Sequence, residues 1–181
     1  MGKSLEKSPR ITAEDYFRMT ADLTDKTELR NGEIVSLASP GRTHQRISSH
    51  LHHAVEAYIR KNGGSCEVNE ALNARLDDST VVIPDVMVVC DSEKMDEKGC
   101  NGAPDWVIEI VSANRRDDFI YKLALYQDSG VREYWIIDPK NEKTLVYFFE
   151  QSDFPDIYTF DAAIPVGISG GKLAVRITDL L

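Results

Sequence analysis

Two acidic residues interrupt strongly apolar, β-branched runs, and they constrain the fold of this chain more than any other feature. Asp85 lies in the run TVVIPDVMVVC and Glu109 in the run DWVIEIVS. Runs of this kind are typical of buried strands. A carboxylate without a partner in such surroundings would cost several kcal/mol, because an apolar interior does not solvate charge. The candidates for compensation are a divalent cation, the ammonium group of Lys122 on the following predicted helix, or both.

Strand geometry predicts where these carboxylates point. Along the segment 106–111, the period of two places Glu109 on the same face as Val107 and Val111. Asp85 follows Pro84 directly, and proline belongs at the start or edge of a strand. If the two segments are neighbours in one sheet, both carboxylates can converge at one end of it. The sequence therefore predicts a metal site at that end.

The residues around both carboxylates resemble a nuclease motif. Pro84-Asp85 followed by Glu109 resembles PD-(D/E)xK, in which Asp and Glu bind magnesium and a lysine positions the attacking water, although Val111 occupies the lysine position here. Longer phrases, which span roughly residues 27–148, are similar to the Uma-type family of restriction endonucleases, known mostly as a domain of unknown function. These phrases are TELRNGEIVSLASPGRTHQRI, TVVIPDVMVV, GAPDWVIEIVS and KLALYQDSGVREYWIIDP.

This resemblance implies both a fold and a chemistry. The fold is restriction-endonuclease-like, of the α/β (α+β) class, with a central mixed β-sheet flanked by helices. The implied activity is metal-dependent hydrolysis of the phosphodiester bonds of DNA by an endonuclease. Asp85, Glu109 and the backbone carbonyl of Ile110 would bind Mg²⁺ or Mn²⁺. In that family the lysine has moved to the following helix, and Lys122 is the matching residue.

Helical spacing leaves two interpretations of Lys122 open. Phe119, Leu123 and Tyr126 form the apolar stripe of the predicted helix, and Lys122 projects at its margin. The side chain can reach inward and act in catalysis, or it can lay its stem on the core and expose its charge.

Two other functions also remain open. The chain has a net charge of −9 and no lysine in the motif strand, which would suit a catalytically degenerate module that binds nucleic acid or protein. Alternatively, Asp85, Glu109 and Lys122 form a buried ion-pair network that serves only structure.

The N-terminal part offers further acidic candidates. A β-hairpin is predicted over 26–30 and 33–38, around Asn31-Gly32. Its Glu33, which matches the family phrase NGEIV, could be a third acidic residue of the site or an ordinary charged residue. For Glu28 we favour a cross-strand pair or a solvated face, and for Glu70 a polar strand face.

A long helix predicted over 43–61 contains all four histidines. His44 and Gln45 lie in its first turn, where a helix N-terminus favours phosphate, and they are candidate substrate-binding residues with Arg46. Arg115 and Arg116 could extend a local basic patch for DNA. The remaining histidines are expected to be structural or exposed, namely His50, His52 and His53.

Length and composition narrow the class of protein. With 181 residues, 42% of them hydrophobic, the chain suits one domain over 11–181 after a flexible leader over 1–10. It contains no apolar run near 18 residues and no signal-peptide pattern, so we expect a cytoplasmic protein. Cys66, Cys90 and Cys100 are expected to be free thiols. Exposed C-terminal edge strands could support a homodimer.

The remaining elements follow from periodicity and turn residues. A short helix is expected near 12–19, one strand over 66–76 and another over 80–90, and a surface loop that could include a helical turn over 91–104. A helix over 115–130 should precede strands at 131–137 and 144–149. Glu133 and Asp138 are expected at the ends or edges of these strands.

Overall fold

The computed structural model describes residues 10–112 and 116–181, and the side chains of residues 116–119 lie outside its description. The predicted leader falls on residues 1–9 and Arg10, of which only Arg10 is described. The described residues contain three α-helices: α1 (Ala13–Thr20), α2 (Arg42–Asn62) and α3 (Arg116–Ser129). None of the described helices is both long enough and apolar enough to cross a membrane.

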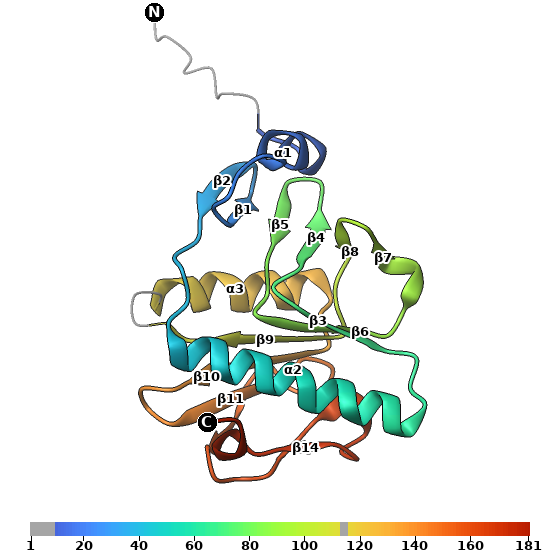
Figure 1. The fold of residues 1–181 in the computed structure, drawn as a ribbon, viewed down its shortest axis with the longest axis vertical. Helices are drawn as coiled ribbons and strands as arrows, with labels where there is room; N and C mark the ends of the chain where they lie inside the picture. Colours follow the sequence, from blue (N-terminus) through green and yellow to red (C-terminus); the bar gives the residue numbers. More distant parts are fainter. Residues whose placement is uncertain (1–9, 113–115) are drawn as a thin grey trace, which may run out of the picture.

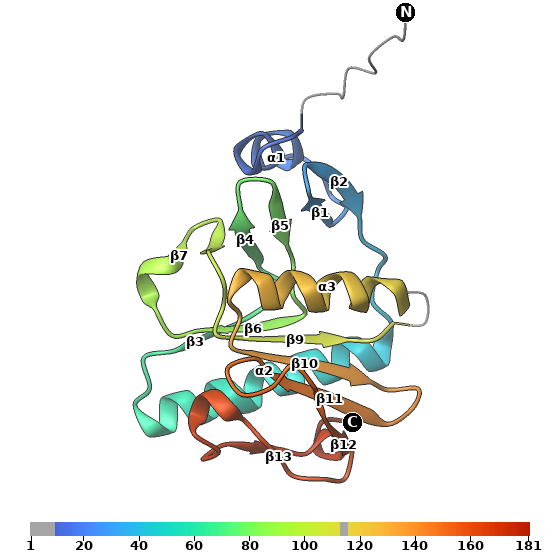
Figure 2. The same ribbon diagram turned by 180° about the vertical axis from the view of Figure 1, so that it is seen from behind.

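A mixed central sheet lies between the two longer helices. Its strand order is β12-β11-β10-β9-β6-β3, in which β9 and β10 are parallel and the other neighbours antiparallel. Its strands are β3 (Glu67–Glu70), β6 (Val86–Val89), β9 (Trp106–Ile110), β10 (Glu133–Asp138), β11 (Lys143–Phe148) and β12 (Asp156–Thr159). Helix α2 covers one face (Figure 1) and α3 the other (Figure 2), which confirms the predicted fold class.

Alternation along β9 explains how one strand serves two cores. Ile108 packs with Ile47 and Leu51 of α2, whereas Val107 packs with Tyr126 of α3. Glu109 shares the face of Val107, as the period of two predicts, and therefore points toward α3. Both layers exclude water from the strand that carries this carboxylate.

A second sheet lies next to the central one, with α1 beyond it (Figure 1). Its strand order is β2-β1-β5-β4-β8-β7. Its strands are β1 (Thr27–Arg30), β2 (Glu33–Ser36), β4 (Asn73–Asp77), β5 (Thr80–Val82), β7 (Met95–Asp96) and β8 (Gly99–Asn101). We call it the N-terminal sheet. The hairpin of β1 and β2 turns at Asn31 and Gly32, both with positive φ, as predicted.

Two predicted continuous strands are in fact divided between the sheets, so those predictions were wrong. The segment 66–76 breaks at Ala71, which has a φ of 51°, and the segment 80–90 breaks at residues 83–85. Pro84 has no N–H to donate to a ladder, so the backbone turns there from the N-terminal sheet into the central one. The break places Asp85 at the junction of the two sheets.

The segment 91–104 was predicted to be a surface loop that could include a helical turn. The turn is present as the 3₁₀ helix η1 (Ser92–Lys94), but the two strands that follow it, β7 and β8, were not predicted. Strand β8 pairs in parallel with β4 and so completes the N-terminal sheet. The buried Cys100 anchors this pairing in the core on the α3 side.

The cysteine prediction needs correction as well. Cys66 and Cys90 form a disulfide, and Cys100 is a buried free thiol. The bond is possible because β3 and β6 are antiparallel with Glu67 opposite Val89, which brings the residues one step further along face to face. The sequence separation of 24 residues hid this proximity.

The C-terminal segment packs against the α2 side of the central sheet. It contains β13 (Ile164–Pro165), β14 (Ala174–Val175) and two 3₁₀ turns, η2 (Gly167–Ser169) and η3 (Ile177–Leu180). Glu133 begins β10, at a strand end as predicted, and it is fully buried. Its carboxylate accepts hydrogen bonds from the N–H groups of Gly167 and Ile168, at 3.0 and 2.8 Å, and from the Trp135 indole at 2.7 Å. These bonds join β10 to η2.

Candidate active site

Asp85 and Glu109 lie beside each other where β6 meets β9. The antiparallel register pairs Val86 with Ile108, so Asp85 stands opposite Glu109 one step further along. The Ile110 N–H donates a 2.7 Å hydrogen bond to Asp85 Oδ2. The Asp85 side chain keeps 21% of its surface exposed, whereas the Glu109 residue keeps only 4%. One carboxylate is therefore open to solvent and the other is enclosed.

Helix α3 holds the enclosed carboxylate from above the sheet. Lys122 and Tyr126 are one helical turn apart, and both donate to Glu109 Oε1 at 2.7 Å, from Nζ and from the phenolic OH. Lys122 is only 1% exposed, so its side chain reaches inward. No described residue donates a hydrogen bond to Oε2, which leaves this oxygen for another partner.

Glu28 on β1 is a third carboxylate, and it lies beside Lys122. The prediction that Glu28 forms a cross-strand pair or lies on a solvated face was wrong. Glu28 is fully buried, and its Oε1 lies 3.2 Å from Lys122 Nζ and 3.1 Å from the Ile83 N–H nitrogen. Arg30 donates to its Oε2, from Nε at 2.8 Å and also from Nη2. The N-terminal sheet thus supplies a buried charge to a site on the central sheet.

The two buried carboxyls respond to this environment in opposite directions. Burial raises the pKa of Glu109 to about 7; Lys122 opposes the shift, while the charges of Asp85 and Glu28 add to it. Burial also disfavours the charged form of Glu28, but Lys122, Arg30 and the Ile83 N–H outweigh it and lower its pKa. Negative charge is thus in excess around Glu109, where a cation would be favoured.

The oxygens left over suit a hard divalent cation. Oδ1 of Asp85 and Oε2 of Glu109 receive no hydrogen bond from the described residues. The Ile110 N–H points toward Asp85, and the carbonyl of a strand residue points to the same edge as its N–H. Among the described residues, no three His, Cys, Asp or Glu side chains form a complete metal cage. Mg²⁺ does not need one, because it binds one or two carboxylates and keeps several waters.

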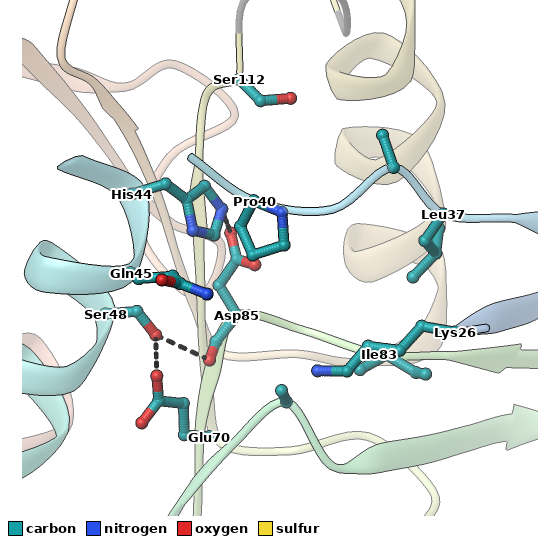
Figure 3. Close-up of a pocket in the computed structure, with 12 residues that line it drawn as sticks. Lys26, Leu37, Pro40, His44, Gln45, Ser48, Glu70, Ile83, Asp85 and Ser112 are labelled. Carbon is teal, nitrogen blue, oxygen red and sulfur yellow. Dashed lines mark hydrogen bonds and ion pairs between the residues drawn. The ribbon is translucent and has the colours of Figure 1, made fainter. Parts of the chain in front are cut away.

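A pocket of about 140 Å³ opens beside Asp85 (Figure 3). Its lining comes from α2 and from the segments before β1, between β2 and α2, around the β3–β4 turn, between β5 and β6, and after β9. Lys26 extends its ammonium group toward the side where Asp85 lies (Figure 3), and this group makes no ion pair with the described part of the chain. Gln45 and His44 line the opposite wall. The pocket therefore gives solvent access to the carboxylate of Asp85.

The other predicted site residues do not all meet here. Glu33 lies on β2 opposite Arg30 with an exposed side chain, and no contact joins it to Asp85 or Glu109. Arg46 is exposed on α2 and does not line the pocket. Arg115 lies outside the described residues, and so does the side chain of Arg116, which begins α3.

The three remaining histidines lie further along α2. His50 Nδ1 is 2.8 Å from the Leu180 carbonyl, and His52 Nε2 is 3.2 Å from the Val68 carbonyl. His53 is exposed. Two of them therefore connect α2 to neighbouring elements, and none lines the pocket.

Sequence reasoning missed three residues of this site. Tyr126 was assigned only to the apolar stripe of its helix, yet its spacing of four from Lys122 was a usable signal. Glu28 faces the site because β1 packs beside α3, which no local pattern reveals. Lys26 carried no signal at all, because it is an exposed residue at the start of the predicted hairpin, directly before β1.

Comparison with known proteins identifies a family, a related protein and a similar solved structure. A family whose description is "Putative restriction endonuclease" matches residues 13–168. An uncharacterized protein of Synechocystis, sll1609, is 20% identical over 163 residues, covering 76% of this chain and 92% of that protein. A crystal structure titled as a "putative nuclease belonging to DUF820", from Anabaena variabilis, superposes with a TM-score of 0.76 at 24% identity. It covers 94% of this chain and 97% of its own, which establishes a shared fold.

Proposed function

We propose a nuclease function from the premise that this chain belongs to the Uma2 family. The reaction is metal-dependent hydrolysis of the phosphodiester backbone of DNA. One observation carries the proposal: Asp85 and Glu109 converge at one end of adjacent strands, beside the Ile110 backbone and within reach of a buried lysine. An oxygen-rich site of this kind, with one cationic side chain, suits phosphodiester hydrolysis.

Asp85, Glu109 and the Ile110 carbonyl are the residues that would hold one Mg²⁺ or Mn²⁺, which would polarise the phosphodiester and lower the pKa of a bound water. Lys122 would orient that water and offset the negative charge that develops during hydrolysis. Its 2.7 Å hydrogen bond to Glu109 keeps the ammonium group beside the metal ligands.

Glu28 and Tyr126 support these residues without contacting substrate. Glu28 holds the second side of Lys122, at 3.2 Å, and so keeps a fully buried ammonium group charged. Tyr126 and Lys122 both donate to Glu109 Oε1, and these two bonds fix the orientation of the carboxylate that would bind the metal. Loss of either would misplace a group that acts directly.

Because the chain carries a net charge of −9, the protein as a whole would repel DNA, and a local group of cationic and N–H donors must bind the phosphates. The pocket beside Asp85 supports this, because Lys26 and the start of α2 line it. Backbone N–H groups at the start of a helix favour phosphate oxygens. A phosphate entering there would approach the exposed oxygen of Asp85 first.

The proposal is tested by calorimetric titration of Mn²⁺ into the wild type and Asp85→Ala, followed by a plasmid-nicking assay in the same buffer. We expect the wild type to bind Mn²⁺ and nick DNA, and Asp85→Ala to lose both. Glu109→Ala should also abolish nicking while the circular dichroism spectrum is retained. Asp78→Ala, an exposed aspartate in the turn between β4 and β5, is the control and should behave as wild type.

The opposite results favour the other functions. A wild type that binds no Mn²⁺ would favour a degenerate module that binds nucleic acid or protein. Nicking that survives in Glu109→Ala would exclude Glu109 as a ligand. If neither metal nor DNA binds and each single substitution costs about 3–5 kcal/mol of stability, the cluster is a structural ion-pair network.

A further inference from the structure

We propose that His44 is a positioning residue, which fixes the orientation of the Asp85 carboxylate and thereby selects the oxygen that faces the metal. This inference rests on the proposed function and adds a role to a residue that lines the substrate pocket. It assigns His44 to the support of a metal ligand, as distinct from direct contact with phosphate.

The hydrogen bonds of Asp85 are divided unequally between its two oxygens. Oδ2 lies 2.7 Å from the Ile110 nitrogen and 2.9 Å from His44 Nε2. Oδ1 receives no hydrogen bond from the described residues. Two donors on one oxygen prevent the carboxylate from rotating about its terminal bond, so Oδ1 alone stays available to a cation.

The surroundings of the His44 ring define which nitrogen donates. Nδ1 is buried and has no hydrogen-bond partner among the described residues. A proton on Nδ1 alone would leave a buried donor unpaired and would bring the lone pair of Nε2 against Asp85 Oδ2. The tautomer with its proton on Nε2 avoids both costs and donates to Asp85. The contact with Asp85 is therefore the hydrogen bond that the ring nitrogens of His44 make within the described part of the chain.

Helix α2 presents a second group to the same aspartate. Ser48 lies one turn after His44, on the same face of the helix. Its Oγ is 3.3 Å from the Asp85 backbone carbonyl and 2.8 Å from Glu70 Oε1 (Figure 3). Helix α2 therefore holds the side chain of Asp85 through His44 and its main chain through Ser48. Asp85 needs this support because it lies between two strands, at a break in the ladder.

The consequence is measurable in metal affinity. Residues that orient a metal ligand through a hydrogen bond typically contribute about 10–100-fold to metal affinity. Removing the His44 donor should therefore weaken Mn²⁺ binding by about 10-fold or more, even though His44 itself is not a ligand. A residue that only contacts phosphate would leave Mn²⁺ affinity unchanged in the absence of DNA.

A matched pair of amides tests this role. The Gln side-chain nitrogen lies the same number of bonds from Cα as Nε2 of histidine, whereas the Asn nitrogen matches Nδ1. Calorimetry of Mn²⁺ with the full chain, without DNA, should give a Kd within about threefold of wild type for His44→Gln and about 10-fold weaker for His44→Asn. His53→Ala, an exposed histidine on the same helix, is the control and should match wild type.

Each contrary result has a distinct meaning. If the wild type binds Mn²⁺ and both His44 variants bind it equally well, His44 does not position Asp85, and the proposed nuclease function stands. Equal weakening of His44→Asn and His44→Gln would also overturn the inference, because the reach of the donor would then be irrelevant. A wild type that binds no Mn²⁺ overturns the proposed function and this inference together.

Discussion

At the residue scale, one lysine serves two carboxylates that differ in their other partners. Glu28 receives further donors from Arg30 and the Ile83 N–H, and its pKa is lowered. Glu109 lies near Asp85 instead, and burial raises its pKa to about 7. Glu28 therefore stabilises the charge of Lys122, while Glu109 holds unfavourable negative charge that a cation would relieve.

This difference predicts how the free energy of unfolding of the metal-free protein depends on pH. The folded pKa of Glu109, about 7, lies above the ordinary value of 4.5, so the folded state binds more protons than the unfolded state between these values. The stabilising contribution is complete below about pH 4.5 and is lost as the pH rises through 7. Glu109→Gln keeps an acceptor for Lys122 and Tyr126 but cannot ionise.

Urea unfolding at pH 5 and pH 8, in EDTA, measures this effect. We expect the wild type to lose about 1–3 kcal/mol more stability between these pH values than Glu109→Gln does. Glu97→Gln, an exposed residue, is the control and should keep the wild-type slope. Equal slopes in wild type and Glu109→Gln would mean that Glu109 does not titrate in this range.

Lys26 gives a second prediction at this scale. Its ammonium group extends into the pocket and has no ion pair with the described residues, so DNA phosphate can take that place (Figure 3). Lys26→Ala should weaken the binding of a DNA oligonucleotide in EDTA and reduce the slope of log affinity against log salt by about 1. Fluorescence anisotropy measures both. Lys61→Ala, at the far end of α2, should leave both unchanged.

At the element scale, Glu133 joins β10 to the C-terminal segment. Its carboxylate accepts three N–H donors in a fully buried position. Glu133→Gln turns one acceptor oxygen into an NH₂ group that faces a donor, so we expect a loss of about 1–3 kcal/mol in urea unfolding. Glu150→Gln, whose ion pair with Arg132 is exposed, should change stability by less than about 1 kcal/mol. A loss in Glu133→Gln as small as that expected for Glu150→Gln, below about 1 kcal/mol, would show that the Glu133 contact with η2 is dispensable.

Local patterns predicted the elements better than their pairing. Helix α2 was predicted because its apolar spacing and the terminal Gly63, with a φ of 65°, are encoded locally. Pro84 correctly indicated that Asp85 lies at the start or edge of a strand. The passage of the chain at 83–85 from one sheet to the other was not predicted, because the β-branched run on both sides of Pro84 favours a single strand. Whether two consecutive strands join one sheet or two depends on packing from β1 and β9, which lies outside any local window.

The same limit applies to the site. Asp85, Glu109 and Lys122 were selected because charge in an apolar run needs compensation, and the structure brings all three together. Glu28 and Glu33 could not be separated in that way, since both lie in a polar hairpin. Only the packing of β1 beside α3 shows that Glu28 is buried while Glu33 is exposed.

At the scale of the whole molecule, the site joins elements from both sheets. Glu28 comes from the N-terminal sheet, Glu109 from the central sheet, Lys122 from α3, and Asp85 from the junction between the sheets. A cation bound by Asp85 and Glu109 would relieve repulsion among the three carboxylates, which come from both sheets and from the junction between them. Metal binding should therefore stabilise the whole fold.

Thermal unfolding with and without Mn²⁺ tests this coupling. At a free Mn²⁺ concentration 100 times Kd, the wild type should gain about 2.7 kcal/mol and a correspondingly higher Tm. Asp85→Asn keeps an acceptor for the Ile110 N–H but loses the charge, so its Tm should respond little to Mn²⁺. The gain should also shrink as the pH falls below 7, because protonation of Glu109 competes with the metal. A rise in Tm that is equal in wild type and Asp85→Asn would place the metal elsewhere on the chain.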